Sequence, residues 1–372
     1  MSLNPVVAYI SRSALRHNLT RVQTFAKSAK VLAMVKANGY GHDAVEVAKT
    51  LINIENPVDA FGVARINEAL VLRQANIQVP IVLMEGCFNK EELLCASEQQ
   101  FEIVLHNKEQ LQHLLSTTLP KPLRVWLKLD TGMGRVGFNQ VELSEAINQL
   151  KGNANVIEPF TCMTHFACAD QLNDERSRQQ LAKFNSVVEA NQPLLSYSCA
   201  NSAAIIANPN AHFEWVRPGI MLFGSSPIQD TVCSDYDLQP VMSLRSIVIA
   251  VRNVKAGETV GYGARWTAQK DTQVAVVAMG YGDGYPRNAK DGTPVMINGV
   301  IYPLAGRVSM DMITVDVGLN SEIKMGDPVT LWGIDELSGE VLPAERVAGY
   351  ADTISYEMFC NLAARVEKRF ID

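Results

Sequence analysis

The sequence of 372 residues lacks several patterns that would assign it to common protein classes. Its seven cysteines form no C-x-x-C pair and its six histidines no H-E-x-x-H motif, so we expect reduced thiols and no metal site. The N-terminal apolar segment is short and has no basic leader, which predicts a cytoplasmic protein with no membrane partner. Acidic residues outnumber basic ones by 39 to 33, and the net charge of −6 disfavours nucleic acid as a partner.

Apolar segments of β type alternate with segments of helical periodicity over the first two thirds of the chain. The segments expected to form strands are residues 31–35, 60–64, 80–84, 101–105, 123–129, 159–164, 195–200 and 214–218. Strands without polar alternation, separated by amphipathic helices, indicate a parallel sheet covered by helices. About eight such units predict an α/β fold with a closed (β/α)8 barrel of the TIM type.

The pattern changes after about residue 235. Short apolar segments joined by glycine-containing turns follow, and Asn298-Gly299 in "MINGVIY" favours a tight hairpin. We therefore expect two domains, a barrel over residues 1–235 and a mostly-β domain over residues 236–372.

Several polar residues lie where predicted barrel strands end, which is where active sites of such barrels are found. They are Lys36, Lys128, Arg135, His165, Asn201, Ser202 and Arg217. A lysine removed from water has a lowered pKa, and its neutral amine can form a Schiff base with an aldehyde. Tyr40, Ser202 and the "RPGI" segment offer hydroxyl and backbone donors for a phosphate. An aldehyde-reactive lysine beside a phosphate site suggests pyridoxal 5'-phosphate.

Two further motifs suggest other chemistry. "DTG" at residues 130–132 matches the aspartic-protease triplet, but that mechanism needs two such carboxylates and the chain has no second copy. "GMGRVG" at residues 132–137 matches the dinucleotide-binding pattern G-x-G-x-x-G. Its helical segment starts after the third glycine rather than within the motif, so we disfavour a nucleotide site.

The segment "AMVKANGYGHD", residues 33–43, resembles the cofactor-lysine motif of alanine racemases. Other segments of the chain resemble that family in the same order: "LKLDTGMGRVGF", "THFACAD", "NSAA", "WVRPGIMLFG", "VGYGARW", "GYGDGYPR", "GRVSMDM" and "GYADTISYE". The resemblance covers essentially the whole chain. Its one visible variation is Gly39, where the family commonly has alanine.

The resemblance implies a role for each matched residue. Lys36 would hold pyridoxal phosphate as an aldimine and act as one base, and Tyr262 would act as the other base. The implied cofactor contacts are Tyr40, His165, Asn201, Ser202, Arg217, Gly219, Ile220 and Tyr350. The implied substrate contacts are Arg135, Met310, Asp311 and Tyr281, and Lys128 would be carboxylated.

Arg217 bears on the type of reaction. The resemblance places this arginine at the pyridine nitrogen, where an acid would be needed to keep the ring protonated. Because a guanidinium keeps its proton, the ring would stay unprotonated, which favours racemisation over transamination. Tyr262 would need positive charge nearby to act as a base, and Arg217 and His165 are candidates to supply it.

In the family the β domain of one subunit completes the partner's active site, so the resemblance implies a homodimer. The expected function is interconversion of L- and D-alanine, either to supply D-alanine for peptidoglycan or for catabolism. A racemase of broader specificity is an alternative. A barrel-type amino-acid decarboxylase is disfavoured, because the chain has neither a Gly-Gly-Gly run nor an acid at position 217. A non-enzymatic cofactor-binding barrel would lack the β domain.

Overall fold

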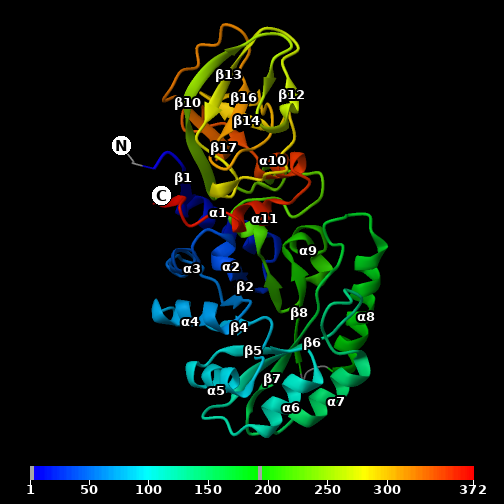
Figure 1. The fold of residues 1–372 in the computed structure, drawn as a ribbon. Coiled ribbons are helices and arrows are strands. Elements are labelled where there is room, and N and C mark those ends of the chain that lie inside the picture. Colours follow the sequence, from blue (N-terminus) through cyan, green and yellow to red (C-terminus); the bar gives the residue numbers. More distant parts are fainter. Residues whose placement is uncertain (1–3, 192–194) are drawn as a thin grey trace. The chain divides into compact units, whose positions relative to one another are not determined.

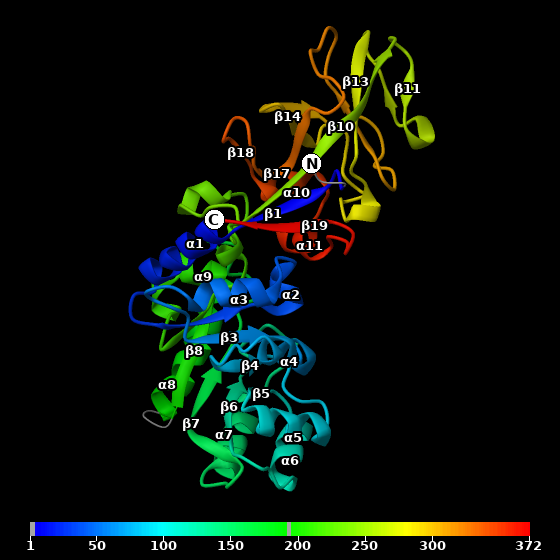
Figure 2. The same ribbon diagram turned by 90° about the vertical axis from the view of Figure 1, so that its left-hand side faces the viewer.

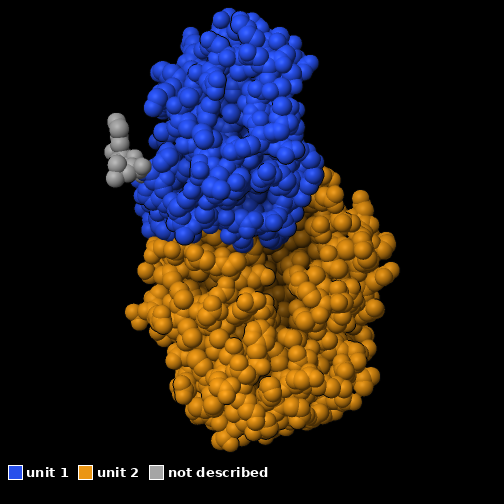
Figure 3. Space-filling model, viewed as in Figure 1, with its two compact units in different colours: residues 1–17, 223–226, 231–372 blue, residues 18–222, 227–230 orange. Residues whose placement is uncertain are grey.

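The computed structural model describes residues 4–191 and 195–372, and the chain forms two compact units (Figure 3). The first unit contains the N-terminal segment up to His17, together with Phe223–Ser226 and Thr231–Asp372. The second unit contains Asn18–Leu222 and Pro227–Asp230. This division differs from a single boundary at residue 235, because the start of the chain belongs to the same unit as its C-terminal third.

The second unit contains a closed barrel, β2 to β9, as the sequence predicts. Its strands are β2 (Lys30–Met34), β3 (Ala60–Val63), β4 (Ile81–Leu83), β5 (Glu102–Leu105), β6 (Leu123–Lys128), β7 (Val156–Met163), β8 (Leu195–Asn201) and β9 (Trp215–Arg217). Neighbouring strands pair in parallel, and Lys30 opposite Trp215 joins β2 to β9 and closes the ring. The barrel prediction is confirmed.

Helices precede, separate and follow the barrel strands along the chain (Figures 1 and 2). They are α1 (Arg12–Phe25), α2 (Lys36–Tyr40), α3 (Ala44–Ile52), α4 (Ile66–Gln74), α5 (Lys90–Gln99), α6 (Lys108–Ser116), α7 (Gln140–Leu150), α8 (Glu175–Asn191) and α9 (Ser202–Ala207), with the short 3-10 helices η1 (Pro209–Ala211) and η2 (Ile220–Phe223). The parallel pairing leaves the carboxyl ends of all eight strands at one mouth of the barrel, which positions the candidate site.

The first unit is built on a nine-stranded sheet around the long strand β10 (Figure 2). Its strands are β1 (Val7–Ser11), β10 (Met242–Val254), β13 (Thr272–Val277), β14 (Pro294–Ile297), β15 (Val300–Pro303), β16 (Ile313–Asp316), β17 (Pro328–Ile334), β18 (Val341–Leu342) and β19 (Glu367–Ile371). β11 (Thr259–Val260) and β12 (Trp266–Thr267) form a separate pair, and the helices are η3 (Cys233–Tyr236), η4 (Tyr262–Ala264), η5 (Tyr281–Asp283), α10 (Ala344–Tyr350) and α11 (Ser355–Cys360). The mostly-β prediction is confirmed.

The hairpin predicted at Asn298-Gly299 joins β14 to β15. Both residues have positive φ, 52° at Asn298 and 78° at Gly299, as a tight two-residue turn between twisted strands requires. Within the described residues, no helix has the length and apolar character needed to span a membrane.

Candidate active site

The polar residues predicted at strand ends lie at the barrel mouth. Lys128 is the last residue of β6, Asn201 the last of β8 and Arg217 the last of β9. Lys36 begins α2 directly after β2, and His165 lies two residues beyond β7. Parallel strands bring these positions, which are distant in sequence, to one end of the second unit.

The backbone after Lys36 makes a left-handed turn. Ala37, Asn38 and Gly39 have φ of 52°, 53° and 64°, and Tyr40 continues with φ 52°. Each non-glycine residue in this region costs about 1–2 kcal/mol, so surrounding contacts must hold the turn. Asn38 provides two of them: its Oδ1 accepts a hydrogen bond from the Ala44 amide at 2.9 Å, and its carbonyl accepts one from the Asp43 amide at 3.0 Å.

This turn buries Tyr40 and leaves Lys36 exposed in the single chain. The sequence-based argument that Lys36 can form a Schiff base assumed that its amine is removed from water. In the single chain Lys36 is exposed, so that condition is not met.

Two hydroxyl groups and one glycine meet beside this turn. The Ser202 hydroxyl accepts a hydrogen bond from the Gly219 amide at 2.8 Å, and a side chain at position 219 would overlap the Tyr40 hydroxyl. The absence of a Cβ at Gly219 therefore lets the Tyr40 hydroxyl lie against the backbone there, next to the Ser202 hydroxyl. Asn201 caps α9 by accepting from the Ala204 amide at 3.0 Å, which fixes Ser202 at the start of that helix. This arrangement suits a phosphate group.

Arg217 is buried in the barrel mouth, with 3% of its surface exposed. Its guanidinium donates to the Ser198 hydroxyl and to the Thr164 carbonyl, both at 2.6 Å. His165 Nδ1 lies 3.4 Å from the same guanidinium, so the shorter bonds to Ser198 and Thr164 orient Arg217 more directly than His165 does. Burial lowers the pKa of Arg217 to about 10, which leaves it charged at neutral pH.

Positive charge accumulates around this arginine. Burial, followed by the charges of Arg217, Arg135 and Lys36, lowers the pKa of Lys128 to about 8. Burial and the same group of cations hold the pKa of His165 well below its usual value. His165 is therefore neutral at pH 7, so Arg217 rather than His165 can supply the positive field expected near a tyrosine base. An anionic ligand would relieve the repulsion at this mouth.

The loop after β6 carries Arg135. The Asp130 carboxylate accepts hydrogen bonds from the Gly132 and Gly134 amides, and the Phe138 amide returns to the Lys128 carbonyl at 2.8 Å. The acid of the "DTG" triplet therefore stabilises a turn. The glycines of "GMGRVG" belong to this closed loop at the end of a barrel strand, which excludes a Rossmann nucleotide site.

In the first unit, two loops hold the predicted substrate contacts Tyr281, Met310 and Asp311. The Tyr281 amide donates to the Ser309 carbonyl at 3.0 Å, and the Gly282 amide donates to the Met310 carbonyl at 2.8 Å. Tyr281, Met310 and Asp311 therefore lie together. Arg365 joins the loops from the C-terminal end of the chain, with Nε 2.6 Å from Asp283 and Nη2 2.8 Å from Asp311.

Tyr262 lies in η4 between β11 and β12, and 69% of its surface is exposed. The flanking Gly263 faces the Arg307 side chain, so this turn lies beside the segment that leads to Met310. Tyr350 ends α10, and its carbonyl accepts a hydrogen bond from the Lys290 amide at 3.1 Å. Met310 is likewise exposed, with 55% of its surface accessible.

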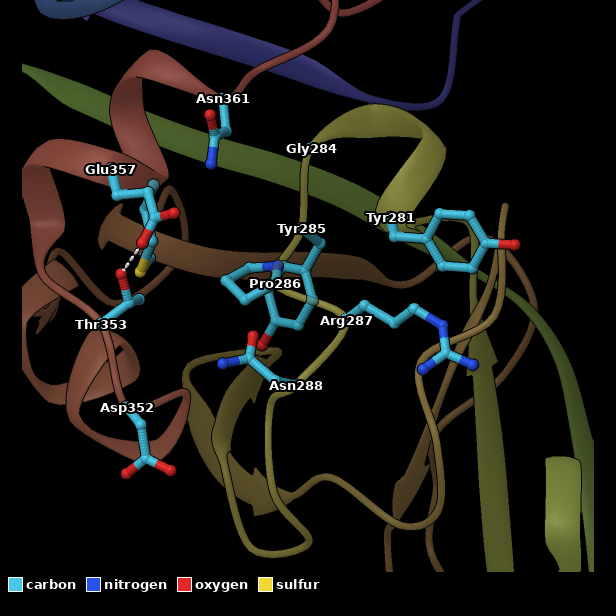
Figure 4. A pocket seen from close by; sticks show the side chains of 11 residues that line it. Tyr281, Gly284, Tyr285, Pro286, Arg287, Asn288, Asp352, Thr353, Glu357 and Asn361 are labelled. Atoms are coloured by element: carbon cyan, nitrogen blue, oxygen red, sulfur yellow. Dashed lines mark hydrogen bonds between the residues drawn. The ribbon is translucent and has the colours of Figure 1, made fainter.

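A polar pocket of about 370 Å³ opens beside Tyr281 (Figure 4). The Arg287 guanidinium lies 5.8 Å from the centre of the Tyr281 ring. The residues that line the pocket are Tyr281, Gly284, Tyr285, Pro286, Arg287, Asn288, Asp352, Thr353, Glu357, Met358 and Asn361. The pocket therefore places positively and negatively charged side chains next to Tyr281, a predicted substrate contact.

Several supporting residues were not predicted. They include Thr164 and Ser198, which hold Arg217, and Arg365, which joins the loops of the first unit. Gln180 on α8 is another, because it bonds the His165 carbonyl at 3.0 Å and the Ala167 amide at 2.9 Å. Of these, only Thr164 and Ser198 carry a sequence signal, since each is a polar residue near the end of an apolar strand.

Comparison with known proteins assigns the family. The model of the alanine racemase N-terminal domain matches residues 10–227, and that of the C-terminal domain matches residues 241–370. The alanine racemase of Aeromonas hydrophila is 47% identical over 370 residues, which cover 99% of this chain and 100% of that protein. The biosynthetic alanine racemase of Escherichia coli K12 is 46% identical over 364 residues, 98% of each chain.

Solved structures agree with these matches. The crystal structure of the biosynthetic alanine racemase from Pseudomonas aeruginosa has a TM-score of 0.94 and 40% identity, and covers 100% of both chains. The alanine racemase of Acinetobacter baumannii has a TM-score of 0.90 at 40% identity, covering 99% of this chain and 100% of that one. With both domains matched in order over nearly the whole chain, this chain belongs to the alanine racemase family and is an isomerase.

Proposed function

We propose that the barrel mouth binds pyridoxal 5'-phosphate and that Lys36 attaches it covalently. The observation that carries this proposal is the close approach of the Tyr40 and Ser202 hydroxyls to the Gly219 backbone, which has no Cβ to keep the tyrosine away. Ile220 belongs to the same proposed phosphate site, and Asn201 is proposed as a further cofactor contact. Tyr350, which lies in the first unit, stays a predicted phosphate contact. The charges of Lys36, Lys128, Arg135 and Arg217 favour an anionic ligand here.

When bound, the cofactor withdraws electrons from the amino acid and so acidifies its α-hydrogen. Arg217 would face the ring nitrogen and, being protonated, would donate a hydrogen bond without releasing a proton. Its two short bonds, to Ser198 and Thr164, fix the direction of that donor. Neutral His165 would pack beside it as a further part of the cofactor site.

Racemisation requires a base on each face of the α-carbon, because the proton must leave from one side and be replaced from the other. Lys36 Nζ and Tyr262 Oη are the proposed pair. Each would move a proton to or from the α-carbon, and such groups typically contribute about 10²–10⁴-fold to the rate. Arg135 and the backbone of Met310 would bind the substrate carboxylate, with Asp311 beside them. Tyr281 and Tyr350 would narrow the entrance and limit the size of the substrate side chain.

The exposure of Tyr262, Tyr281 and Met310 supports a homodimer in which these residues serve the partner's barrel. Such an arrangement would also cover Lys36, which is exposed in the single chain. We therefore propose two composite sites per dimer.

Lys128 is the proposed site of a carbamate, formed when its neutral amine attacks carbon dioxide and loses a proton. The new anion would pair with Arg135 and remove a buried positive charge. Because the pKa of Lys128 is about 8, the neutral amine fraction rises as pH passes through 8. With dissolved carbon dioxide held fixed, the NMR signal of ¹³C-labelled carbamate should grow between about pH 7 and 9. Lys128→Arg should lack it, and an equal signal in that variant would place the carbamate elsewhere.

Incubation of the protein and pyridoxal phosphate with L-alanine in D2O tests the function directly. Chiral chromatography should show equal amounts of the two enantiomers at equilibrium, since their free energies are equal, and each product molecule should carry solvent deuterium at the α-carbon. Conversion that retains the original α-hydrogen would contradict two exchanging bases. L-serine and other amino acids in parallel distinguish a broad-specificity racemase, and carbon dioxide release would indicate decarboxylation.

The E. coli and P. aeruginosa relatives are named biosynthetic alanine racemases, which favours supply of D-alanine, with peptidoglycan as the expected destination. A catabolic role and a cytoplasmic location stay predictions.

A further inference from the structure

Three barrel helices begin with a glutamate at their third residue that accepts a hydrogen bond from backbone preceding the helix. On α5, Glu92 accepts from the Phe88 amide at 2.8 Å. On α7, Glu142 accepts from the Asn139 amide at 3.1 Å. On α4, Glu68 accepts from the Ala64 amide at 2.7 Å and the Arg65 amide at 3.2 Å through the same oxygen. All three therefore serve as helix caps of the same kind.

Glu68 has a second contact that its counterparts do not share. Its other oxygen, Oε1, accepts a hydrogen bond from the Ala37 amide at 2.6 Å. The corresponding oxygen of Glu142 instead lies 3.3 Å from Lys108 Nζ, on the outside of the barrel unit. The carboxylate of Glu68 thus joins the start of α4 and the end of β3 to the residue that follows Lys36.

The Ala37 amide, which bonds to Glu68, belongs to a segment whose backbone conformation is unfavourable by itself. Ala37 is the first residue of the left-handed turn, with φ 52° and ψ 49°. The hydrogen bonds made by Asn38 fix the far end of the turn, at Asp43 and Ala44. Glu68 fixes the near end, so the direction in which Lys36 leaves the backbone depends on this carboxylate. A carboxylate offers only acceptors, which matches the three amides that it faces.

We propose that Glu68 is a positioning residue for Lys36 and Tyr40, holding the left-handed turn in the conformation that receives the cofactor. The part of this inference that concerns cofactor binding rests on the proposed function. The part that concerns the conformation of the turn rests on the hydrogen bond from the Ala37 amide to Glu68. If Glu68 served only as a helix cap, its replacement would have the same effects as replacement of Glu92.

The test compares Glu68→Gln with the matched control Glu92→Gln in the full-length protein. Glutamine keeps the shape but replaces one acceptor oxygen with an N–H donor, so at least one of the three amides facing Glu68 loses its acceptor. Amide hydrogen exchange is followed over residues 36–44, with and without pyridoxal phosphate. Release of cofactor from the loaded enzyme is followed by absorbance after dilution.

We expect faster exchange over residues 36–44 in E68Q alone, and cofactor release faster by about tenfold to a hundredfold, the range of a charged hydrogen bond. E92Q should match wild type in both measurements. If E68Q behaves as E92Q does, the positioning role is overturned. If the wild-type protein binds no pyridoxal phosphate, the proposed function fails, and exchange without cofactor still decides the role of Glu68. Should E68Q not fold, Glu68→Asp and Glu92→Asp are compared by the same criteria.

Discussion

Lys36→Ala is expected to reduce alanine racemisation by at least about 10³-fold, since the variant loses both covalent attachment of the cofactor and one of the two bases. The alanine side chain removes the amine without changing the backbone of the left-handed turn, which Asn38 and Glu68 hold through other atoms. The loss should therefore be chemical rather than structural. Thermal unfolding of the variant should stay close to that of the wild type in the absence of cofactor.

The measurement combines chiral chromatography with mass spectrometry after borohydride reduction, which makes the lysine–cofactor bond permanent. Wild-type protein should carry the cofactor on the peptide that contains Lys36, and the variant should carry none there. Lys27→Ala is a suitable control because Lys27 is an exposed lysine of the same unit. Racemisation by Lys36→Ala at the wild-type rate, or attachment of the cofactor to another lysine in wild type, would contradict the role given to Lys36.

The barrel was predictable from the sequence because its strands are buried on both faces. β3, for example, is buried along its whole length, so it has no polar alternation. Some intervening segments, such as α3 with Ala44, Val47, Ala48 and Leu51 buried, have a helical period. Knowledge of the strand ends then places Lys36, Lys128 and Arg217 at one mouth. These inferences need only local patterns and one general property of parallel barrels.

Contacts between distant segments were not predictable in the same way. β1 pairs with β10, 238 residues away at Val7 and Arg245, and with β19, and nothing in "VAYIS" distinguishes such a strand from a barrel strand. A helix-capping role for Glu68, at the start of α4, could be predicted from the sequence. That its second oxygen reaches Ala37 depends on how the α2 turn packs against α4, which no local pattern encodes.

Tyr262→Phe should lower racemisation by about 10²–10⁴-fold while leaving α-hydrogen exchange of one enantiomer intact. The substitution removes only the hydroxyl, and Tyr262 is exposed on its unit, so folding should be unaffected. With Lys36 as the remaining base, one enantiomer can lose its α-hydrogen to solvent and regain deuterium on the same face. Proton NMR in D2O would show this exchange without conversion. Tyr302→Phe in β15 of the same unit is the control, and loss of exchange for both enantiomers would contradict the two-base assignment.

Coexpression of Lys36→Ala and Tyr262→Phe chains tests whether the two bases come from different subunits. If they do, each hybrid dimer contains one site with both bases and one site with neither. Random pairing makes about half of the dimers hybrids, so about a quarter of wild-type activity should return from two nearly inactive proteins. If each site were formed within one chain, every site in the mixture would lack one base and no activity would return. Recovery on mixing would therefore explain why Lys36 and Tyr262 are both exposed in the single chain.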